Sequence, residues 1–158
     1  MPEKDVKEIV ATLGLMTEAE RCLSRFYLQC AEKLPADRAF WEKLSADENV
    51  HAGNIARMAG IVIEKLGAGF EANRAFNRIS INTFLLGVDA NSEALKKGAL
   101  AGRRIYYVVR DIEQALLEAR YGEVVKAADA GYTALLKEIM VEERQHIADL
   151  EGKIASLG

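Results

Sequence analysis

Hydrophobic residues recur every three or four positions along nearly the whole chain, and this spacing constrains the fold more than any other feature. The first such stripe comprises Leu13, Met16, Glu20, Leu23, Tyr27, Cys30 and Leu34. Steps of three and four residues place all of these side chains on one face of an α-helix. Alternating runs of Val, Ile and Thr, which would indicate strands, do not occur. The chain is therefore predicted to be all-α.

Four stripes of this kind predict four long helices, at about residues 3–34, 38–66, 92–126 and 129–157. Pro35 ends the first helix, and Asp37 is placed to cap the second. The short links near Pro35 and Ala128 make the first two helices a hairpin, and likewise the last two.

The link between the two predicted hairpins is long. Residues 68–91 are less regular, although 74–86 could form a short helix, and they are numerous enough to cross the molecule from end to end. We therefore expect a single domain over residues 1–158, an antiparallel four-helix bundle of two hairpins joined by a long crossover.

The composition excludes several classes of function. The chain has 21 Lys+Arg against 24 Asp+Glu and no block of one sign, so neither nucleic acid nor a membrane is expected as its main partner. No apolar run is long enough to span a bilayer, and the first ten residues are too charged for a secretory signal. A cytoplasmic location is expected. Cys22 and Cys30 lie too far apart on one predicted helix to form a disulfide with each other.

Each predicted helix carries ionisable residues in the middle of its apolar stripe. They are Glu20 in the first helix, Glu48 and His51 in the second, Glu113 in the third, and Glu143 and His146 in the fourth. Burying an unpaired charge costs several kcal/mol, so four carboxylates at one level of a core require a cation beside them.

Both histidines of the chain end a Glu-x-x-His motif. With 17 Glu among 158 residues, random placement would put Glu three positions before both histidines only about 1% of the time. The spacing places carboxylate and imidazole on the same helix face. Glu20 and Glu48 are equidistant from the first hairpin turn, and Glu113 and Glu143 from the second, so in each hairpin a Glu faces a Glu-x-x-His motif.

This pattern resembles the ferritin-like, rubrerythrin-related di-iron carboxylate proteins, which use one Glu from each of two helices and a Glu-x-x-His motif from each of the other two. Tyr27, seven residues after Glu20, also resembles a tyrosine in the first helix of rubrerythrins. The resemblance implies that Glu48 and Glu143 bridge two metals, that Glu20 and Glu113 bind terminally, and that His51 and His146 bind one ion each. It implies a catalytic role beside the ligands for Tyr27.

The resemblance also implies a cofactor and a reaction. Two divalent ions would neutralise four glutamates and two neutral imidazoles, and iron is expected, with manganese or zinc compatible with the ligand types. The implied activity is a peroxidase or ferroxidase reaction of Fe(II) with peroxide or dioxygen, in a homodimer.

The chain departs from the family at three places. Arg110 and Leu116 stand where rubrerythrins carry an additional glutamate near the third-helix ligand. No rubredoxin-like segment with cysteine pairs is present, so a separate electron donor is expected. Only 12 residues follow His146, whereas cage-forming ferritins add a fifth helix.

Four alternatives remain open at this stage. A hydroxylase would use the same ligands beside a substrate cavity, which Ala99 and Gly102 could line. A metal carrier or sensor would bind without turnover. A bundle without metal would pair its carboxylates with Arg110 or Arg120, and in the simplest alternative the six residues are charges on solvated helix faces.

Overall fold

The computed structural model describes residues 3–72, 78–118, 125–127 and 129–157. The helices described are α1 (Glu3–Lys33), α2 (Arg38–Glu64), α3 (Arg78–Lys97), α4 (Arg104–Glu118) and α5 (Ala130–Ser156), with a 3-10 turn, η1 (Pro35–Asp37), between α1 and α2. Two three-residue strands, β1 (Phe70–Ala72) and β2 (Val125–Ala127), pair antiparallel. The prediction of an all-α chain is confirmed apart from this strand pair.

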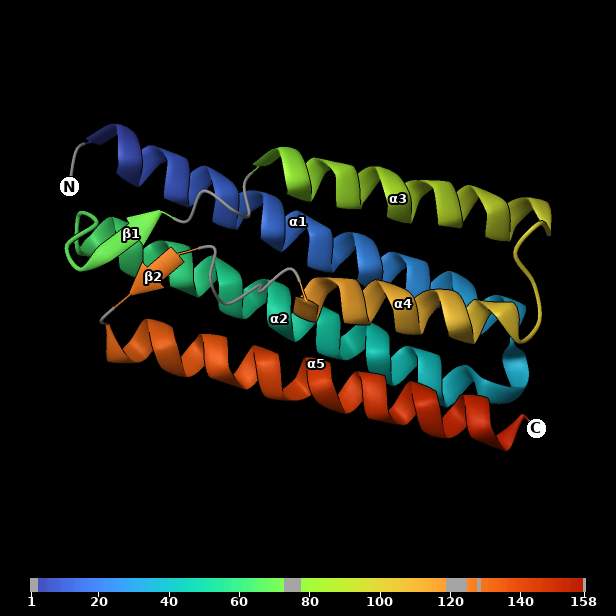
Figure 1. The fold of residues 1–158 in the computed structure, drawn as a ribbon. Helices are drawn as coiled ribbons and strands as arrows, with labels where there is room; N and C mark the ends of the chain where they lie inside the picture. The colour runs from blue at the N-terminus through green and yellow to red at the C-terminus, as the bar shows by residue number, and fades with distance from the viewer. Residues whose placement is uncertain (1–2, 73–77, 119–124, 128, 158) are drawn as a thin grey trace.

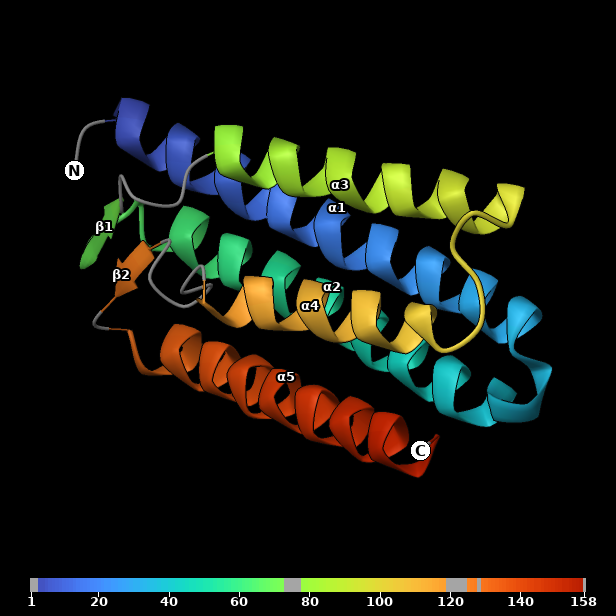
Figure 2. The ribbon, with the colours of Figure 1, turned by 45° about the vertical axis from the view of Figure 1, so that its right-hand side comes forward.

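The helices lie side by side with their long axes roughly aligned (Figure 1 and Figure 2). α1 packs along α2, α4 along α5, and α2 against α5, while α3 lies on α1. The chain turns at η1 and returns along α2, so the end of α1 and the start of α2 meet at one end of the molecule. The ends of α3 and α5 and the start of α4 lie at that same end, and the strand pair lies at the other. Among the described helices, none is long and apolar enough to cross a membrane.

The predicted third helix over residues 92–126 is wrong. In its place, α3 ends at Lys97 and α4 begins at Arg104. Gly98 and Gly102, on either side of this connection, have φ of +78° and +63°, a left-handed conformation that ends helices and that glycine adopts without a steric penalty. Residues 119–124 lie outside the described part of the chain, and residues 125–127 form β2 rather than helix.

The predicted crossover over residues 68–91 is more regular than expected. Most of it belongs to α3, which starts at Arg78 and runs for 20 residues. Ile81, Val88 and Leu95 are its buried residues, spaced seven apart. Such spacing gives the helix one apolar stripe, which accounts for its packing on α1.

Two aspartates connect the helices at the two ends of the molecule. Asp129 accepts a hydrogen bond from the Tyr132 backbone N–H at 2.8 Å, capping α5, and pairs with Lys65 at the end of α2 at 2.7 Å. Asp37 precedes α2 but makes no capping hydrogen bond, so its predicted role is wrong. Its carboxylate instead accepts hydrogen bonds from the Tyr106 hydroxyl and from Lys153 Nζ, joining α4 and α5 to the η1 turn.

Candidate metal centre

The structure brings all six sequence-predicted ligands together in the core. Their exposed fractions are 0 to 2%. They come from four helices: Glu20 from α1, Glu48 and His51 from α2, Glu113 from α4, and Glu143 and His146 from α5. Each lies on the buried stripe of its helix because its spacing from the apolar neighbours is three or four residues. The alternative that these residues are solvated surface charges is therefore wrong.

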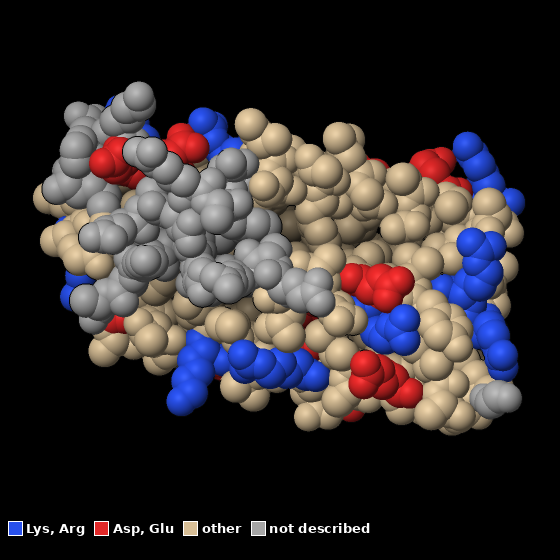
Figure 3. Space-filling view, viewed as in Figure 1, with Lys and Arg blue, Asp and Glu red and all other residues tan. Residues whose placement is uncertain are grey.

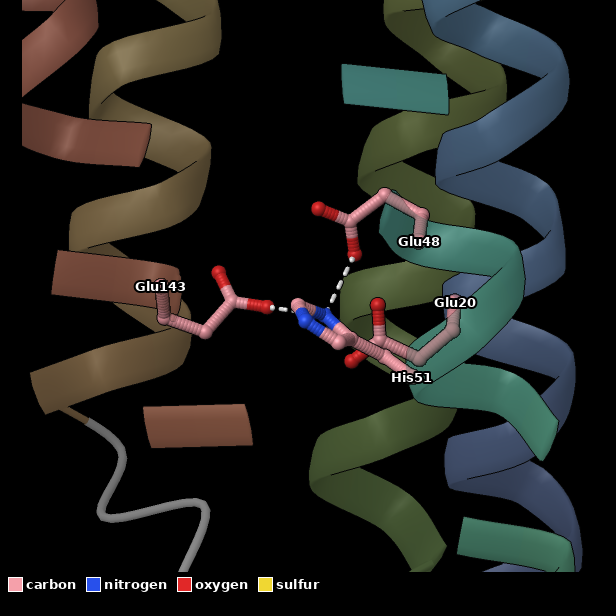
Figure 4. A group of neighbouring side chains, drawn as sticks. All are labelled: Glu20, Glu48, His51 and Glu143. Carbon is pink, nitrogen blue, oxygen red and sulfur yellow. Dashed lines mark ion pairs between the residues drawn. The ribbon is translucent and has the colours of Figure 1, made fainter. Parts of the chain in front are cut away.

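The ligand atoms form two overlapping groups. One consists of Glu20, Glu48, His51 and Glu143, and the other of Glu48, Glu113, Glu143 and His146; within each group, one ligand atom per residue lies within 4.8 Å of the others. Figure 4 shows His51 between the carboxylates of Glu48 and Glu143. Each group could hold a metal ion, and Glu48 and Glu143 are common to both. This sharing is what a pair of bridging carboxylates requires.

The two histidines are oriented in the same way. His51 Nε2 donates to Glu142 Oε2 at 2.7 Å, and His51 Nδ1 lies 3.1 Å from Glu143 Oε1 and 3.4 Å from Glu48 Oε2. Because a carboxylate can only accept, the proton of this outer bond lies on Nε2. Nδ1 therefore faces the ligand cluster.

His146 repeats this arrangement from the opposite helix. Its Nε2 donates to Asp47 Oδ2 at 3.0 Å, and its Nδ1 lies 3.1 Å from Glu48 Oε1 and 3.6 Å from Glu113 Oε1. The two imidazole rings are 5.7 Å apart between centroids. Each histidine is thus fixed by an outer carboxylate on the partner Glu-x-x-His helix, an arrangement typical of metal-binding imidazoles.

Asp47 and Glu142 were not among the residues predicted from the sequence. A signal was present, since each immediately precedes the Glu of a Glu-x-x-His motif. Within α2, Asp47 stands four residues before His51, which would suggest a contact within one helix. The structure instead pairs Asp47 with His146 of α5. That pairing depends on how α2 and α5 dock.

Several buried polar atoms of the cluster lack hydrogen-bond partners of acceptable geometry among the described residues. These are both carboxylate oxygens of Glu48 and of Glu143, and Nδ1 of both histidines. Buried polar atoms without hydrogen bonds are costly and rare in native proteins. The same atoms converge on one another within the ligand groups, so the donor set fits a bound cation.

The pKa values of the cluster show how strongly its negative charge attracts protons. Burial, followed by the charge of Glu113, raises the pKa of Glu48 to about 7, and the same two causes raise the pKa of Glu143. Burial alone would lower the pKa of His146, but the carboxylates of Glu113 and Glu48 outweigh it and raise that pKa to about 11. Burial alone would raise the pKa of Glu113, yet its neighbours Glu143 and His146 stabilise the ionised form and hold its pKa at about 2. A metal ion would compete with these protons.

Tyr27 lies against the cluster from α1. Its hydroxyl donates to Glu113 Oε1 at 2.5 Å, and its side chain is fully buried. Burial, with the charge of Glu113, raises the pKa of Tyr27 well above its ordinary value. The phenol therefore stays protonated and keeps donating. The contact that Tyr27 makes with the candidate ligands is thus to Glu113 of α4.

The structure contradicts the alternative in which Arg110 pairs with the carboxylates of a bundle without metal. Arg110 pairs with Asp111 at 3.2 Å and stands over the Tyr107 ring at 5.2 Å. Among the described residues, the ion pairs of Glu48, Glu113 and Glu143 are all with His51 or His146. Arg120, the other candidate counter-ion, lies outside the described residues.

Comparison of the chain with protein-family models, with curated proteins and with solved structures found no match in any of the three. The resemblance to rubrerythrin-related proteins therefore stays a prediction, and the candidate centre rests on the geometry of the chain's own residues.

Proposed function

We propose that the protein is a ferritin-like, rubrerythrin-related di-iron oxidoreductase that reacts Fe(II) with peroxide or dioxygen, as a peroxidase or ferroxidase. In this proposal α1, α2, α4 and α5 are the antiparallel four-helix bundle, and α3 is the crossover between its hairpins. The observation that carries the proposal is that two ligand groups share Glu48 and Glu143. Two shared carboxylates suit two neighbouring ions better than a single one.

The chemistry of the donor set supports iron. Mixed carboxylate and imidazole ligands are compatible with iron, manganese and zinc, and four glutamates balance two divalent ions. Bound iron would supply the redox chemistry that peroxide or dioxygen requires. Zinc would offer no such chemistry.

The chain's own residues would perform three tasks at this centre. Asp47 and Glu142 hold the imidazoles so that both Nδ1 atoms face inward. Tyr27 donates to Glu113 and orients its carboxylate. The buried setting of the ligands excludes bulk water and strengthens every electrostatic interaction within the cluster.

Titration of the metal-free protein with Fe(II) in the absence of oxygen tests the proposal. We expect two ions per chain, followed by oxidation on addition of peroxide or air that is faster than in buffer alone. Glu143→Gln should lower the amount of iron bound. Glu138→Gln, which changes an exposed glutamate on the same helix, should bind as the unmodified chain does. Failure to bind two ions, or oxidation no faster than in buffer, would refute the proposal.

The same titration separates an enzyme from a carrier or sensor. A carrier would bind Fe(II) reversibly and release it to a chelator in its original oxidation state after exposure to peroxide. An oxidoreductase would return ferric iron.

An apolar cavity favours a second candidate function, hydroxylation of an organic substrate. It is a solvent-open groove of about 330 Å³ between α3 and α4, with Phe84, Val88, Val108 and Ile112 among its lining residues, and none of the six candidate ligands lines it. Ile112 directly precedes the ligand Glu113. Ala99 and Gly102, predicted to line such a cavity, lie in the α3–α4 connection instead. An oxygenated product from iron-loaded protein supplied with small hydrocarbons and dioxygen, lost in Ile112→Trp, would favour this function over peroxidase or ferroxidase activity.

A further inference from the structure

Three aromatic side chains form a column that leads from the candidate metal centre toward one end of the molecule. Tyr27 of α1, hydrogen-bonded to Glu113, lies next to Trp41 of α2, with 6.2 Å between ring centroids. Trp41 lies next to Tyr106 of α4, with 5.2 Å between centroids. All three are buried, with exposed fractions of 0 to 3%. Tyrosine and tryptophan are the protein side chains most readily oxidised by one electron, and neighbouring rings at such spacings exchange electrons quickly.

Both ends of the column have a carboxylate that can take a phenolic proton. The Tyr27 hydroxyl donates to Glu113, and the Tyr106 hydroxyl donates to Asp37. Loss of an electron makes a phenol strongly acidic, so a hydrogen-bonded carboxylate allows the proton to move at the same time. Trp41 has no carboxylate partner among the described residues, and its indole lies beside Tyr106. Oxidised Trp41 can regain an electron from that neighbour, as a relay requires.

The outer end of the column reaches the surface through Asp37. The Asp37 side chain is 24% exposed and that of Lys153, its partner at 2.8 Å, is 33% exposed. Phe40, which is not readily oxidised, packs against Trp41 and Tyr106, and Lys153 Nζ lies 5.2 Å from its ring centroid.

Basic side chains gather at this end of the molecule. Because the ends of α1, α3 and α5 and the start of α4 meet there (Figure 1), the basic residues at those helix ends converge. The group, which we call the basic end, comprises Lys33, Lys97, Arg103, Arg104 and Lys153. Figure 3 shows Lys and Arg along the right-hand edge of the surface at this end. Asp37 pairs with Lys153 at this end, so the excess positive charge comes from the other four residues, in a chain whose net charge is −3.

We propose that Tyr27, Trp41 and Tyr106 are an electron relay, and that an anionic one-electron donor at the basic end supplies electrons through it to the metal centre. The relay rests on the proposed function, since it needs an electron acceptor beside Glu113. An electron passes inward from Tyr27 while its hydroxyl proton moves along the hydrogen bond to Glu113. Tyr27 regains an electron from Trp41 and the proton from Glu113, and Trp41 regains an electron from Tyr106. As Tyr106 loses its electron, its O–H bond breaks and the proton moves to Asp37. The donor then returns one electron to the Tyr106 radical, and Asp37 returns the proton, so the donor is the only group left oxidised.

The relay can be tested without any metal. A ruthenium polypyridyl photo-oxidant would be attached to a cysteine at the exposed position beside Asp37, using Ala36→Cys in a Cys22→Ser background. After a flash with an external quencher, transient absorption and EPR would follow tryptophanyl and tyrosyl radicals. We expect a long-lived tyrosyl radical on buried Tyr27, with a yield that falls severalfold in Trp41→Phe and in Tyr27→Phe.

Trp41→Phe keeps an aromatic ring in the core but removes the oxidisable one. Tyr132→Phe is the matched control, because Tyr132 is equally buried but packs on Phe70, outside the column. Circular dichroism would establish that each variant is folded. A long-lived radical formed equally in Trp41→Phe, Tyr27→Phe and Tyr132→Phe would overturn the relay.

The basic end is tested by the rate at which small donors reduce the photogenerated radical. Ferrocyanide, an anion, should react faster at low salt than at high salt, and hexaammineruthenium(II), a cation, should show the opposite dependence. The double variant Lys33→Glu with Arg104→Glu should slow ferrocyanide severalfold. Equal salt dependence for the two donors would overturn the anionic donor.

Iron-loaded protein links the relay to the proposed function. Addition of peroxide should produce a tyrosyl EPR signal that changes its hyperfine pattern in Tyr106→Phe. A chain that binds no iron but forms the photogenerated Tyr27 radical would refute the di-iron function and leave the conduction pathway standing. A chain that binds iron but forms no Tyr27 radical would refute the relay alone.

Discussion

Each histidine of the ligand cluster contacts carboxylates through both of its ring nitrogens. On the outer side, Glu142 and Asp47 accept from the Nε2 atoms, and on the inner side the Nδ1 atoms face Glu48 and Glu143. The outer bonds set the ring orientation and keep the Nε2 proton in place, so Nδ1 is the nitrogen available to a metal.

Removal of the outer bonds should weaken metal binding without removing a ligand. We expect Asp47→Asn and Glu142→Gln each to raise the metal dissociation constant about 10–100-fold, because the imidazoles lose their fixed orientation and part of their basicity. Competition with a chromophoric chelator would measure this. Glu138→Gln should leave the affinity unchanged, and equal affinities in all three variants would contradict the assigned orientation.

Glu48 should destabilise the metal-free protein. Its carboxyl is fully buried, and its two oxygens lack hydrogen bonds of acceptable geometry among the described residues. We expect Glu48→Gln to stabilise the metal-free protein at pH 8 by about 1–2 kcal/mol. The raised pKa of Glu48 means that the folded protein disfavours the ionised carboxylate, and glutamine has nearly the same shape without the charge. Urea unfolding with and without metal would show the gain, together with loss of stabilisation by metal. A decrease in stability of the metal-free variant would contradict this.

At the scale of the elements, the connection between α3 and α4 separates two helices that the periodic pattern merges. Gly98 and Gly102 both have positive φ, and a Cβ at either position would meet no heavy atom within 4 Å. The requirement for glycine is therefore conformational rather than steric, and it decides where α3 stops and α4 begins.

Substitution by alanine should have opposite effects on stability at Gly87, inside α3, and at Gly98, directly after α3. Gly98→Ala should destabilise the protein by about 1–2 kcal/mol, because the left-handed conformation is strained for a residue with a Cβ. Gly87→Ala, in the interior of α3 with equal free space, should stabilise it by about 0.5–1 kcal/mol. Chemical denaturation would measure both, and similar effects at the two positions would contradict the conformational explanation.

In the molecule as a whole, four helices place ionisable side chains in one buried cluster. Glu48 and His146 both bind protons more tightly in the folded protein than in the unfolded chain. Where the native state binds more protons than the unfolded state, stability falls as pH rises.

The metal-free protein should therefore lose stability as the pH increases. The Glu48 contribution declines between its ordinary pKa of 4.5 and about 7, and the His146 contribution declines between 6.5 and about 11. Metal should oppose this loss, with stabilisation that grows with pH because fewer protons compete for the ligands. Thermal melts from pH 5 to pH 8, with and without metal, would measure both trends. Greater metal-free stability at pH 8 than at pH 5 would contradict them.

Long uninterrupted stripes of apolar residues made most of the helices predictable from the sequence. α1, α2 and α5 begin and end within about two residues of the expected bounds, because each has one apolar face and few competing signals. Glu48 and Glu143 share that face with their histidines because an i, i+3 spacing fixes their relative direction. Local periodicity did not distinguish a helix that continues through Gly98 from one that stops there.

Helical periodicity is a local property, so the spacing of residues was enough to predict a helical chain with four glutamates and two histidines on the inner faces of its helices. The contacts of Asp47 with His146, of Tyr27 with Glu113, and of Trp41 with two tyrosines could be seen only in the folded molecule. These contacts join residues far apart in the chain. They depend on the rotation and docking of whole helices, which the spacing within any one helix does not specify.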